Sequence, residues 1–209
     1  MKRLALLITV FLLTSALLYA GLGLPGELDP VLAKSKFTWK KVKLDIEKRF
    51  DKEKLTVILT AFNDKGEKVW SSESLGEQEK FITFSGKKTS LAIKDMDSDG
   101  IPELVAAAMT GPETSALYIY KYQACCNEFL PMNFTYAESK FSRPFMVSDL
   151  YDPNNRDIIV MKNNNIRASG KIYTENDGPI EGYYFFEPKN GEFLCKYIKT
   201  KSELDKPKK

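Results

Sequence analysis

The chain has 209 residues, of which 31 are basic and 28 are acidic, so its formal net charge is +3. A chain so close to neutrality lacks the basic surface that nucleic-acid binding requires, and we expect no nucleic-acid partner. Hydrophobic residues at 43% and aromatic residues at 12% are sufficient for a packed core, which excludes a disordered chain. The sequence contains no histidine, which excludes Ser-His-Asp and Cys-His catalysis and histidine-ligated metal sites.

Residues 1–20 have the pattern of a signal peptide. Two basic residues precede an apolar run that ends at Leu18, and Ala20 lies where a signal peptidase would cut. We expect cleavage, export and a periplasmic or secreted location. An uncleaved segment would instead anchor the chain in a membrane, although it is slightly shorter than the roughly 20 apolar residues that span a bilayer comfortably.

Residues 37–200 are predicted to form one β domain, because hydrophobic residues recur there with a period of two. Hydrophobic and charged residues alternate from Val42 to Glu47, and further strands separated by turn residues follow along the chain. Residues 21–36 contain several glycines and prolines and predict a flexible leader, whereas the polar, lysine-rich residues 201–209 predict a disordered tail. The fold class is therefore predicted to be all-β, built from consecutive antiparallel strands.

The strongest motif is an acidic loop between the strands predicted on either side of residues 95–103. Three aspartates occupy alternate positions and are followed by Gly100, which permits a sharp turn because glycine accepts a positive φ. Calcium prefers six to eight oxygen ligands, and alternate side chains of one tight loop can supply several of them. The loop is not an EF-hand, because its twelfth position is Ala106 rather than glutamate. We expect one calcium ion, bound by Asp95, Asp97, Asp99, Glu103 and the backbone carbonyl of Ile101.

The pattern Asp-x-Asp-x-Asp-Gly-x-x-Glu-Leu-Val over residues 95–105 resembles the calcium loop of FG-GAP/VCBS-type repeats, which are the integrin-like β-propeller repeats. The resemblance implies the same ligand roles for the loop residues, with Glu103 where the family usually has aspartate. It also implies propeller-like blades. At about 45 residues for each blade the chain holds four blades at most, so we expect an incomplete propeller or a β-meander array.

Residues 147–160 can be aligned with the first loop as a second, degenerate copy of the repeat. Asp149 and Asp157 take the places of the first and last carboxylates, but Tyr151 and Pro153 stand where the other two aspartates would be. We therefore expect this copy to be architectural and free of metal.

Three cysteines in an exported chain allow one disulfide and leave one cysteine over. Cys125 and Cys126 are adjacent, and a bridge between neighbours would form a strained ring. We expect Cys195 to pair with one of the two, and the sequence does not decide which.

The residues contain no catalytic constellation, and we do not expect an enzyme. The carboxylates cluster in one loop, where a calcium ion would keep them ionised, whereas a general acid needs a raised pKa. The resulting hypothesis is an exported, non-catalytic, calcium-stabilised β-repeat module of the cell envelope that binds another macromolecule, such as an envelope protein, or a glycan. The alternative is a secreted, carboxylate-dependent polysaccharide hydrolase with Asp149 or Asp157 among its acids.

Tyrosines are the predicted contact groups of such a module, because aromatic residues are common where proteins recognise partners. Tyr118, Tyr120 and Tyr122 fall on one face of a predicted strand, and Tyr183 and Tyr184 lie near the terminal hairpin. We expect at least one tyrosine row on an open sheet face. The competing interpretation is a half-buried row whose hydroxyl groups reach the rim of the core.

Overall fold

The computed structural model describes residues 29–136, 142–150, 157–174 and 178–204. The predicted signal peptide and the first part of the predicted leader, residues 21–28, lie outside the described residues. The described chain is all-β with one short helix, so the predicted all-β class is confirmed. Its strand pairs are antiparallel apart from two short parallel pairs in the third sheet.

The first sheet, called here the N-terminal sheet, is an antiparallel meander whose neighbours in space are also neighbours in sequence. Its strands are β1 (Val31–Trp39), β2 (Val42–Asp51), β3 (Thr56–Phe62) and β4 (Lys68–Ser71). A turn at residues 63–66 connects β3 to β4, and Gly66 adopts a positive φ of 78° there. Of these strands, β2 is the one that the alternation of hydrophobic and charged residues predicted most directly.

The second sheet, called the central sheet, is organised around two long neighbouring strands, β9 (Glu103–Met109) and β10 (Ser115–Gln123). Two short strands, β8 and β5, pair with the free edge of β9, and two others, β11 and β14, pair with the free edge of β10. The bounds of these short strands are Gln78–Glu79 for β5, Leu91–Lys94 for β8, Glu128–Pro131 for β11 and Phe145–Ser148 for β14.

The third sheet, called the C-terminal sheet, has eight strands in the order β13-β12-β18-β17-β16-β15-β6-β7. Its longest strands are β16 (Ile166–Thr174), β17 (Gly178–Lys189) and β18 (Glu192–Thr200), and β17 and β18 form the terminal hairpin that the sequence predicted. The short members are β6 (Ile82–Phe84), β7 (Lys87–Thr89), β12 (Phe134–Thr135), β13 (Ser142–Arg143) and β15 (Ile158–Val160).

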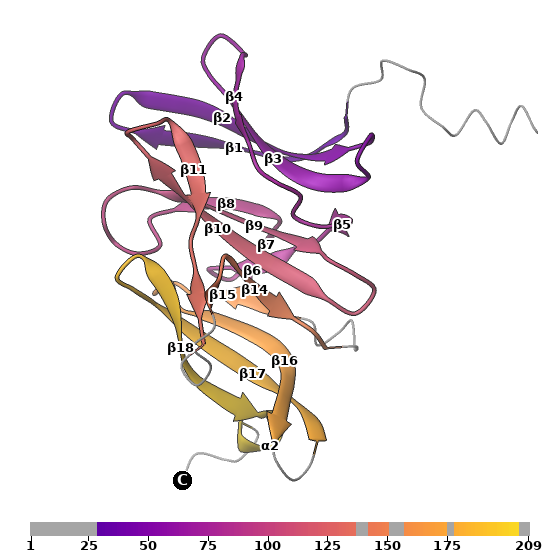
Figure 1. The fold of residues 1–209 in the computed structure, drawn as a ribbon. Helices are drawn as coiled ribbons and strands as arrows, with labels where there is room; N and C mark the ends of the chain where they lie inside the picture. The colour runs from indigo at the N-terminus through magenta and orange to yellow at the C-terminus, as the bar shows by residue number, and fades with distance from the viewer. Residues whose placement is uncertain (1–28, 137–141, 151–156, 175–177, 205–209) are drawn as a thin grey trace, which may run out of the picture.

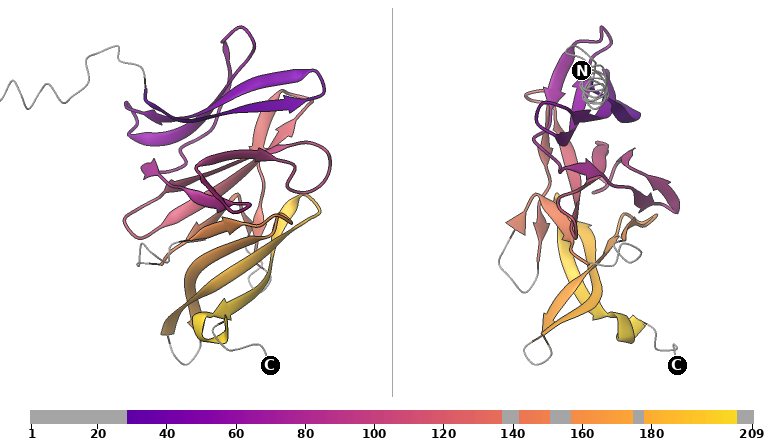
Figure 2. Two further views of the ribbon diagram at one scale, coloured as in Figure 1. Left: turned by 180° about the vertical axis from the view of Figure 1, so that it is seen from behind. Right: turned by 90° about the vertical axis from the view of Figure 1, so that its right-hand side faces the viewer.

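The three sheets are stacked with the central sheet between the other two (Figures 1 and 2). The chain crosses between the central and C-terminal sheets more than once, because β6 and β7 belong to the C-terminal sheet and β14 belongs to the central sheet. Two hydrophobic cores fill the spaces between the three sheets. The upper core joins the N-terminal and central sheets through residues such as Phe37, Leu59 and Leu104. The lower core joins the central and C-terminal sheets through residues such as Val105 and Phe186.

Strand β9 supplies both cores, because successive residues of a strand point to opposite faces of the sheet. Leu104, Ala106 and Ala108 enter the upper core, whereas Val105 and Ala107 enter the lower core. This double burial explains the unbroken apolar run after the acidic loop, since a strand covered on both faces needs no polar alternation.

Lys48 connects two layers from inside the protein. It lies on β2, its side chain is 0% exposed, and its ammonium group donates to the carbonyls of Ala107 at 2.7 Å and Ser90 at 3.3 Å. Ala107 lies between the residues of β9 that pair with β8 and with β5. The Lys48 ammonium group thus donates to a β9 carbonyl at the gap between the two strands, β8 and β5, that pair with this edge of β9. Glu79, 3.4 Å away, is its ion-pair partner.

Both predicted ends of the β domain need correction. Strand β1 begins at Val31 and pairs with β2 up to the β1–β2 turn, so the second half of the predicted leader is a strand. The glycine and proline pattern of the leader ends at Pro30. Residues Lys201–Leu204 form the helix α2, so the predicted disordered tail was wrong over those residues. Thr200 and Glu203 form a capping box at its start, in which each side chain bonds the other residue's N–H.

The predicted second copy of the repeat does not reproduce the first in the described residues. In the first copy the flanking strands β8 and β9 pair with each other. Of the strands flanking the second loop, β14 pairs with β10 in the central sheet, whereas β15 pairs with β16 and β6 in the C-terminal sheet. Residues 151–156 of this copy lie outside the described residues. The segment therefore passes between two layers instead of forming a hairpin.

Candidate metal centre

The acidic loop closes the β8–β9 hairpin, as the sequence predicted. The last residue pair of the hairpin is Lys94 with Glu103, and the residues between them form the loop. Gly100 has a φ of 85°, and a Cβ at this position would meet nothing within 4 Å. The requirement for glycine is therefore conformational, because L-residues with a side chain are strained in the left-handed region.

The three aspartates hold the loop in shape through their own backbone. Asp95 accepts the N–H groups of Asp99 at 3.2 Å and Gly100 at 2.9 Å, and Asp97 Oδ1 accepts the N–H of Asp99 at 3.3 Å. Asp99 Oδ1 accepts the N–H of Ile101 at 2.8 Å. Short carboxylate side chains favour such local turns, because they reach N–H groups a few residues ahead. One oxygen from each aspartate lies within 4.8 Å of the others, an arrangement that can hold a metal ion.

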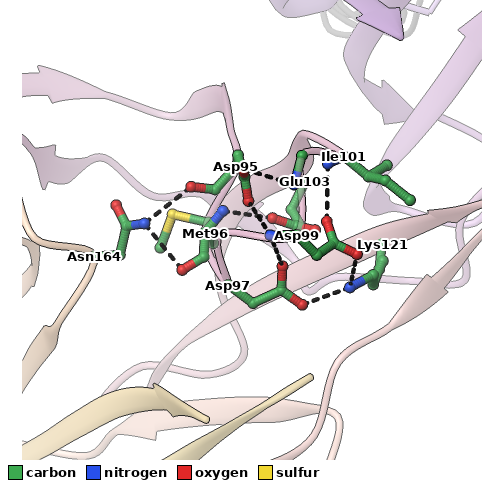
Figure 3. A network of polar contacts seen from close by, with 9 residues as sticks. Asp95, Met96, Asp97, Asp99, Ile101, Glu103, Lys121 and Asn164 are labelled. Atoms are coloured by element: carbon green, nitrogen blue, oxygen red, sulfur yellow. Dashed lines mark hydrogen bonds and ion pairs between the residues drawn. The ribbon is translucent and has the colours of Figure 1, made fainter. Parts of the chain in front are cut away.

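Lys121 neutralises part of this negative charge. Its ammonium group, on β10, lies 2.5 Å from Asp97 Oδ2 and 2.6 Å from Asp99 Oδ2 (Figure 3). Partial burial raises the pKa of Asp99, but the hydrogen bonds from Lys121 and Ile101 outweigh it and leave that pKa below its ordinary value. Burial lowers the pKa of Lys121, and the two aspartates more than compensate, so that its pKa is raised.

Glu103, the fourth predicted ligand, is 0% exposed and holds the base of the loop. Its Oε2 accepts the N–H of Met96 at 2.6 Å, whereas Oε1 is buried and has no hydrogen-bond partner among the described residues. Burial raises the pKa of Glu103 to about 8, although the Met96 N–H acts in the opposite direction. Figure 3 shows its side chain directed into the loop, between Met96 and Asp99. A buried carboxylate oxygen without a partner is costly, and a cation in the loop would supply the missing partner.

Two further residues fix the loop, and sequence analysis missed both. Met96 is fully buried in the lower core, so one apolar side chain anchors the loop to that core. Asn164, in the β15–β16 turn, donates its amide to the carbonyls of Asp95 and Met96, each at 2.9 Å (Figure 3). Three consecutive asparagines at 163–165 marked that turn in the sequence, but nothing there indicated that it meets a loop nearly seventy residues earlier.

The structure thus brings the carboxylates of the four predicted acidic ligands to one loop, and adds Lys121, Met96 and Asn164 around them. The Ile101 N–H donates a hydrogen bond to Asp99. The carbonyl of Ile101 stays a predicted ligand.

The tyrosine row predicted to be an open binding surface is buried, and that prediction was wrong. Tyr118, Tyr120 and Tyr122 all belong to the upper core, where Tyr120 packs on Trp70 and Tyr122 packs on Phe37. The N-terminal sheet covers this face of β10, so the hydrophobic residues on both faces of the strand are enclosed. Burial raises the pKa of Tyr118 to about 12.

The second tyrosine pair is half-buried and lies on opposite faces of β17. The Tyr184 hydroxyl donates to the Lys171 carbonyl at 2.5 Å, and its ring packs against the lower core. Tyr183 faces away from that core, with the guanidinium of Arg167 4.9 Å from the centre of its ring. On the same face the ring of Tyr197, 48% exposed, stacks on Phe185 at 4.5 Å.

The predicted disulfide is not formed. Cys195 is buried in the lower core, whereas Cys125 and Cys126 are exposed in the β10–β11 turn, and none of the three forms a disulfide. The turn between two strands of the central sheet carries the adjacent pair away from the core that holds Cys195.

The two carboxylates of the alternative hydrolase hypothesis are both engaged in local contacts. Asp149 Oδ1 accepts the N–H of Lys171 at 2.7 Å, and Asp157 Oδ2 lies 3.9 Å from Arg167 Nη2.

None of the described helices is long and apolar enough to cross a membrane.

Comparisons with protein-family models, with curated proteins and with solved structures gave no match.

Proposed function

We propose that the protein is an exported, non-catalytic β module of the cell envelope that is stabilised by one calcium ion in the 95–103 loop. The observation that carries the proposal is the buried Oε1 of Glu103, which has no partner among the described residues and lies beside three aspartates whose oxygens are within 4.8 Å of one another. Calcium would supply charge to this oxygen-rich site and would pin β8 to β9.

Calcium is the cation that the donor set favours, because all the donors are oxygens of carboxylates or of the backbone. Soft transition metals prefer sulfur or imidazole, and the sequence contains no histidine. The expected ligand distances are about 2.3–2.6 Å. Extracellular modules bind calcium weakly, which agrees with the proposed export through residues 1–20 to a periplasmic or secreted location.

The blade architecture belongs to the same proposal. Three stacked sheets, with a four-stranded antiparallel meander as the first, support an array of propeller-like blades of the kind that FG-GAP/VCBS repeats imply. The acidic loop then lies at one end of the second layer, where an ion would stiffen the hairpin that contributes to both cores.

A thermal melt tests the calcium role. We expect the melting temperature to rise with calcium and to fall with a chelator, because the ion binds only the folded loop. The double variant Asp97→Asn/Asp99→Asn should melt at one temperature in both conditions, at or below that of the wild type in calcium. A wild-type melting temperature that is the same with calcium and with chelator would refute the calcium role.

For the proposed glycan or protein partner, the aromatic face of the C-terminal sheet replaces the buried tyrosine row. Tyr197 and Phe185 form a partly exposed stacked pair there, and Lys199 lies 5.8 Å from the ring centre of Tyr197. Aromatic rings with nearby cations suit sugar rings that carry acidic groups.

Affinity electrophoresis through acidic and neutral polysaccharides tests this surface. We expect retardation by the acidic gels and its loss in Tyr197→Ala. Phe81→Ala is the matched control, because Phe81 is 49% exposed and also has a lysine, Lys88, near its ring. Equal retardation of wild type and Tyr197→Ala would exclude this face as the contact surface.

A further inference from the structure

We propose that Lys121 is a built-in competitor of the metal ion, whose ammonium group holds two of the carboxylate oxygens that a bound cation needs and so sets the affinity of the loop. The inference rests on the calcium site proposed above and identifies the residue that tunes it.

The hydrogen bonds of the loop show which carboxylate oxygens have a backbone donor and which have none. Asp95 uses both of its carboxylate oxygens on backbone N–H groups, and Oδ1 of both Asp97 and Asp99 is used in the same way. Within the described residues, three carboxylate oxygens of the loop have no backbone donor. These are Asp97 Oδ2, Asp99 Oδ2 and Glu103 Oε1.

Lys121 is bonded to two of these three oxygens. Its ammonium group is 2.5 Å from the Oδ2 atom of Asp97 and 2.6 Å from that of Asp99. The third oxygen, Glu103 Oε1, has no partner, although Glu103 lies directly opposite Lys121 in the pairing of β9 with β10. The ammonium group therefore neutralises Asp97 and Asp99, whereas the buried Oε1 of Glu103 has no cation beside it.

A metal ion that binds Glu103 Oε1 together with the Oδ2 atoms of Asp97 and Asp99 must displace this ammonium group. The backbone of Lys121 is fixed in the middle of the stack, because β10 pairs with β9 on one side and with β11 and β14 on the other. Its side chain is 20% exposed, so a route to solvent exists. Displacement breaks two charge-assisted hydrogen bonds, and the displaced cation still repels the ion that replaces it.

Lys121 also protects the loop when no metal is bound. Asp97 and Asp99 would otherwise repel each other, and the ammonium group converts that repulsion into attraction. The wild-type loop should therefore depend less on calcium for its stability than a loop without this lysine.

Calcium titration by isothermal calorimetry on the purified protein tests the proposal with Lys121→Met, which keeps most of the side-chain volume and removes the charge. We expect its dissociation constant to be at least about tenfold lower than that of the wild type, equal to about 1.4 kcal/mol in binding free energy. The gap between melting temperatures in calcium and in chelator should also be wider in Lys121→Met.

Lys94→Met is the matched control. It removes one positive charge next to the loop, but the Lys94 ammonium donates to the carbonyl of Lys162 at 2.9 Å and does not bridge the aspartates. Its calcium affinity should stay within about threefold of the wild type, since its charge acts only through solvent. Circular dichroism establishes that each variant is folded, and Lys121→Gln repeats the test if Lys121→Met is not.

The outcomes separate this inference from the calcium proposal. Tighter binding by Lys121→Met alone supports the role of Lys121. Binding by Lys121→Met with none by the wild type also supports it, but overturns calcium as the native ligand. Equal affinities of Lys121→Met and wild type overturn the role of Lys121 and leave the calcium site in place. Absence of binding by all the proteins overturns both.

Discussion

Glu103 both supports the fold of the loop and is a ligand of the proposed metal site. It is fully buried and supports the loop through the Met96 N–H, yet one of its oxygens has no partner among the described residues. A wholly structural role would be filled better by a side chain that leaves no polar atom without a partner, because a buried polar atom without a hydrogen bond destabilises the folded state. A cation bound to Glu103 Oε1 would explain why an acidic residue stands at this buried position.

Asn164 is predicted to be the main support of the loop from outside its own hairpin. Its φ is 67°, a conformation that asparagine tolerates and alanine does not, so Asn164→Gly removes the side chain without adding backbone strain. Loss of two hydrogen bonds to buried carbonyls should lower the free energy of unfolding by about 1–3 kcal/mol. Urea denaturation measures the change.

Asn163→Gly provides the comparison for that measurement, because Asn163 is exposed and its side chain accepts only the N–H of Asn165, at 3.3 Å, among the contacts described. It should cost well under half as much as Asn164→Gly. Equal losses for the two variants would show that the contacts between Asn164 and the loop contribute nothing to stability.

At the scale of the elements, the strands could be predicted from the sequence because their periodicity is local. The alternation from Val42 to Glu47 and the apolar run from Leu104 correspond to β2 and β9. The loop between β8 and β9 was predictable for the same reason, since Asp95, Asp97 and Asp99 follow one another in the chain.

The contacts between layers could not be predicted in this way. The tyrosine row on β10 is buried although its alternation predicts one open face, because Ile119, between two of the tyrosines, is also apolar and enters the other core. A strand that is apolar on both faces belongs inside a stack. Lys121 and Asn164 reach the loop from elements far along the chain, and local patterns carry no information on such distances.

Lys48 gives a prediction about how two elements are joined. Burial lowers the pKa of Lys48 to about 8, against the opposing effect of Glu79. Since the unfolded chain then binds more protons than the folded protein between about pH 8 and pH 10.5, stability contributed by this group rises with pH across that window. Below about pH 8 the lysine is protonated in both states and its contribution is constant.

The pH dependence of urea denaturation tests this linkage. From about pH 8 to about pH 9.5 the free energy of unfolding of the wild type should rise by up to about 2 kcal/mol relative to Lys48→Met, which has no group to titrate. Parallel curves for the two proteins would contradict a depressed Lys48 pKa.

At the scale of the whole molecule, the stack explains why the cysteines do not pair as predicted. Cys195 faces the lower core, whereas Cys125 and Cys126 lie at an exposed turn of the central sheet. In the reduced native protein we expect Cys125 and Cys126 to react quickly with a thiol reagent, and Cys195 only after unfolding. Mass spectrometry of the labelled peptides identifies the sites, and rapid native labelling of Cys195 would contradict its burial.

The stack also gives the metal loop its importance for the molecule. The hairpin that carries the loop leads into β9, and β9 contributes to both cores. An ion at the loop would therefore stabilise the layer on which the other two sheets pack, and its effect should appear as a change in global stability instead of local fraying.

Equilibrium dialysis against calcium is the sharpest test of the proposed calcium site, because it counts bound ions without reference to stability. We expect one calcium ion for each chain, with a dissociation constant of about 10⁻⁴–10⁻³ M, and none for Asp97→Asn/Asp99→Asn. The claim is contradicted if the wild type shows no saturable binding up to about 10 mM calcium, well above that range, or if the double variant binds the ion equally well.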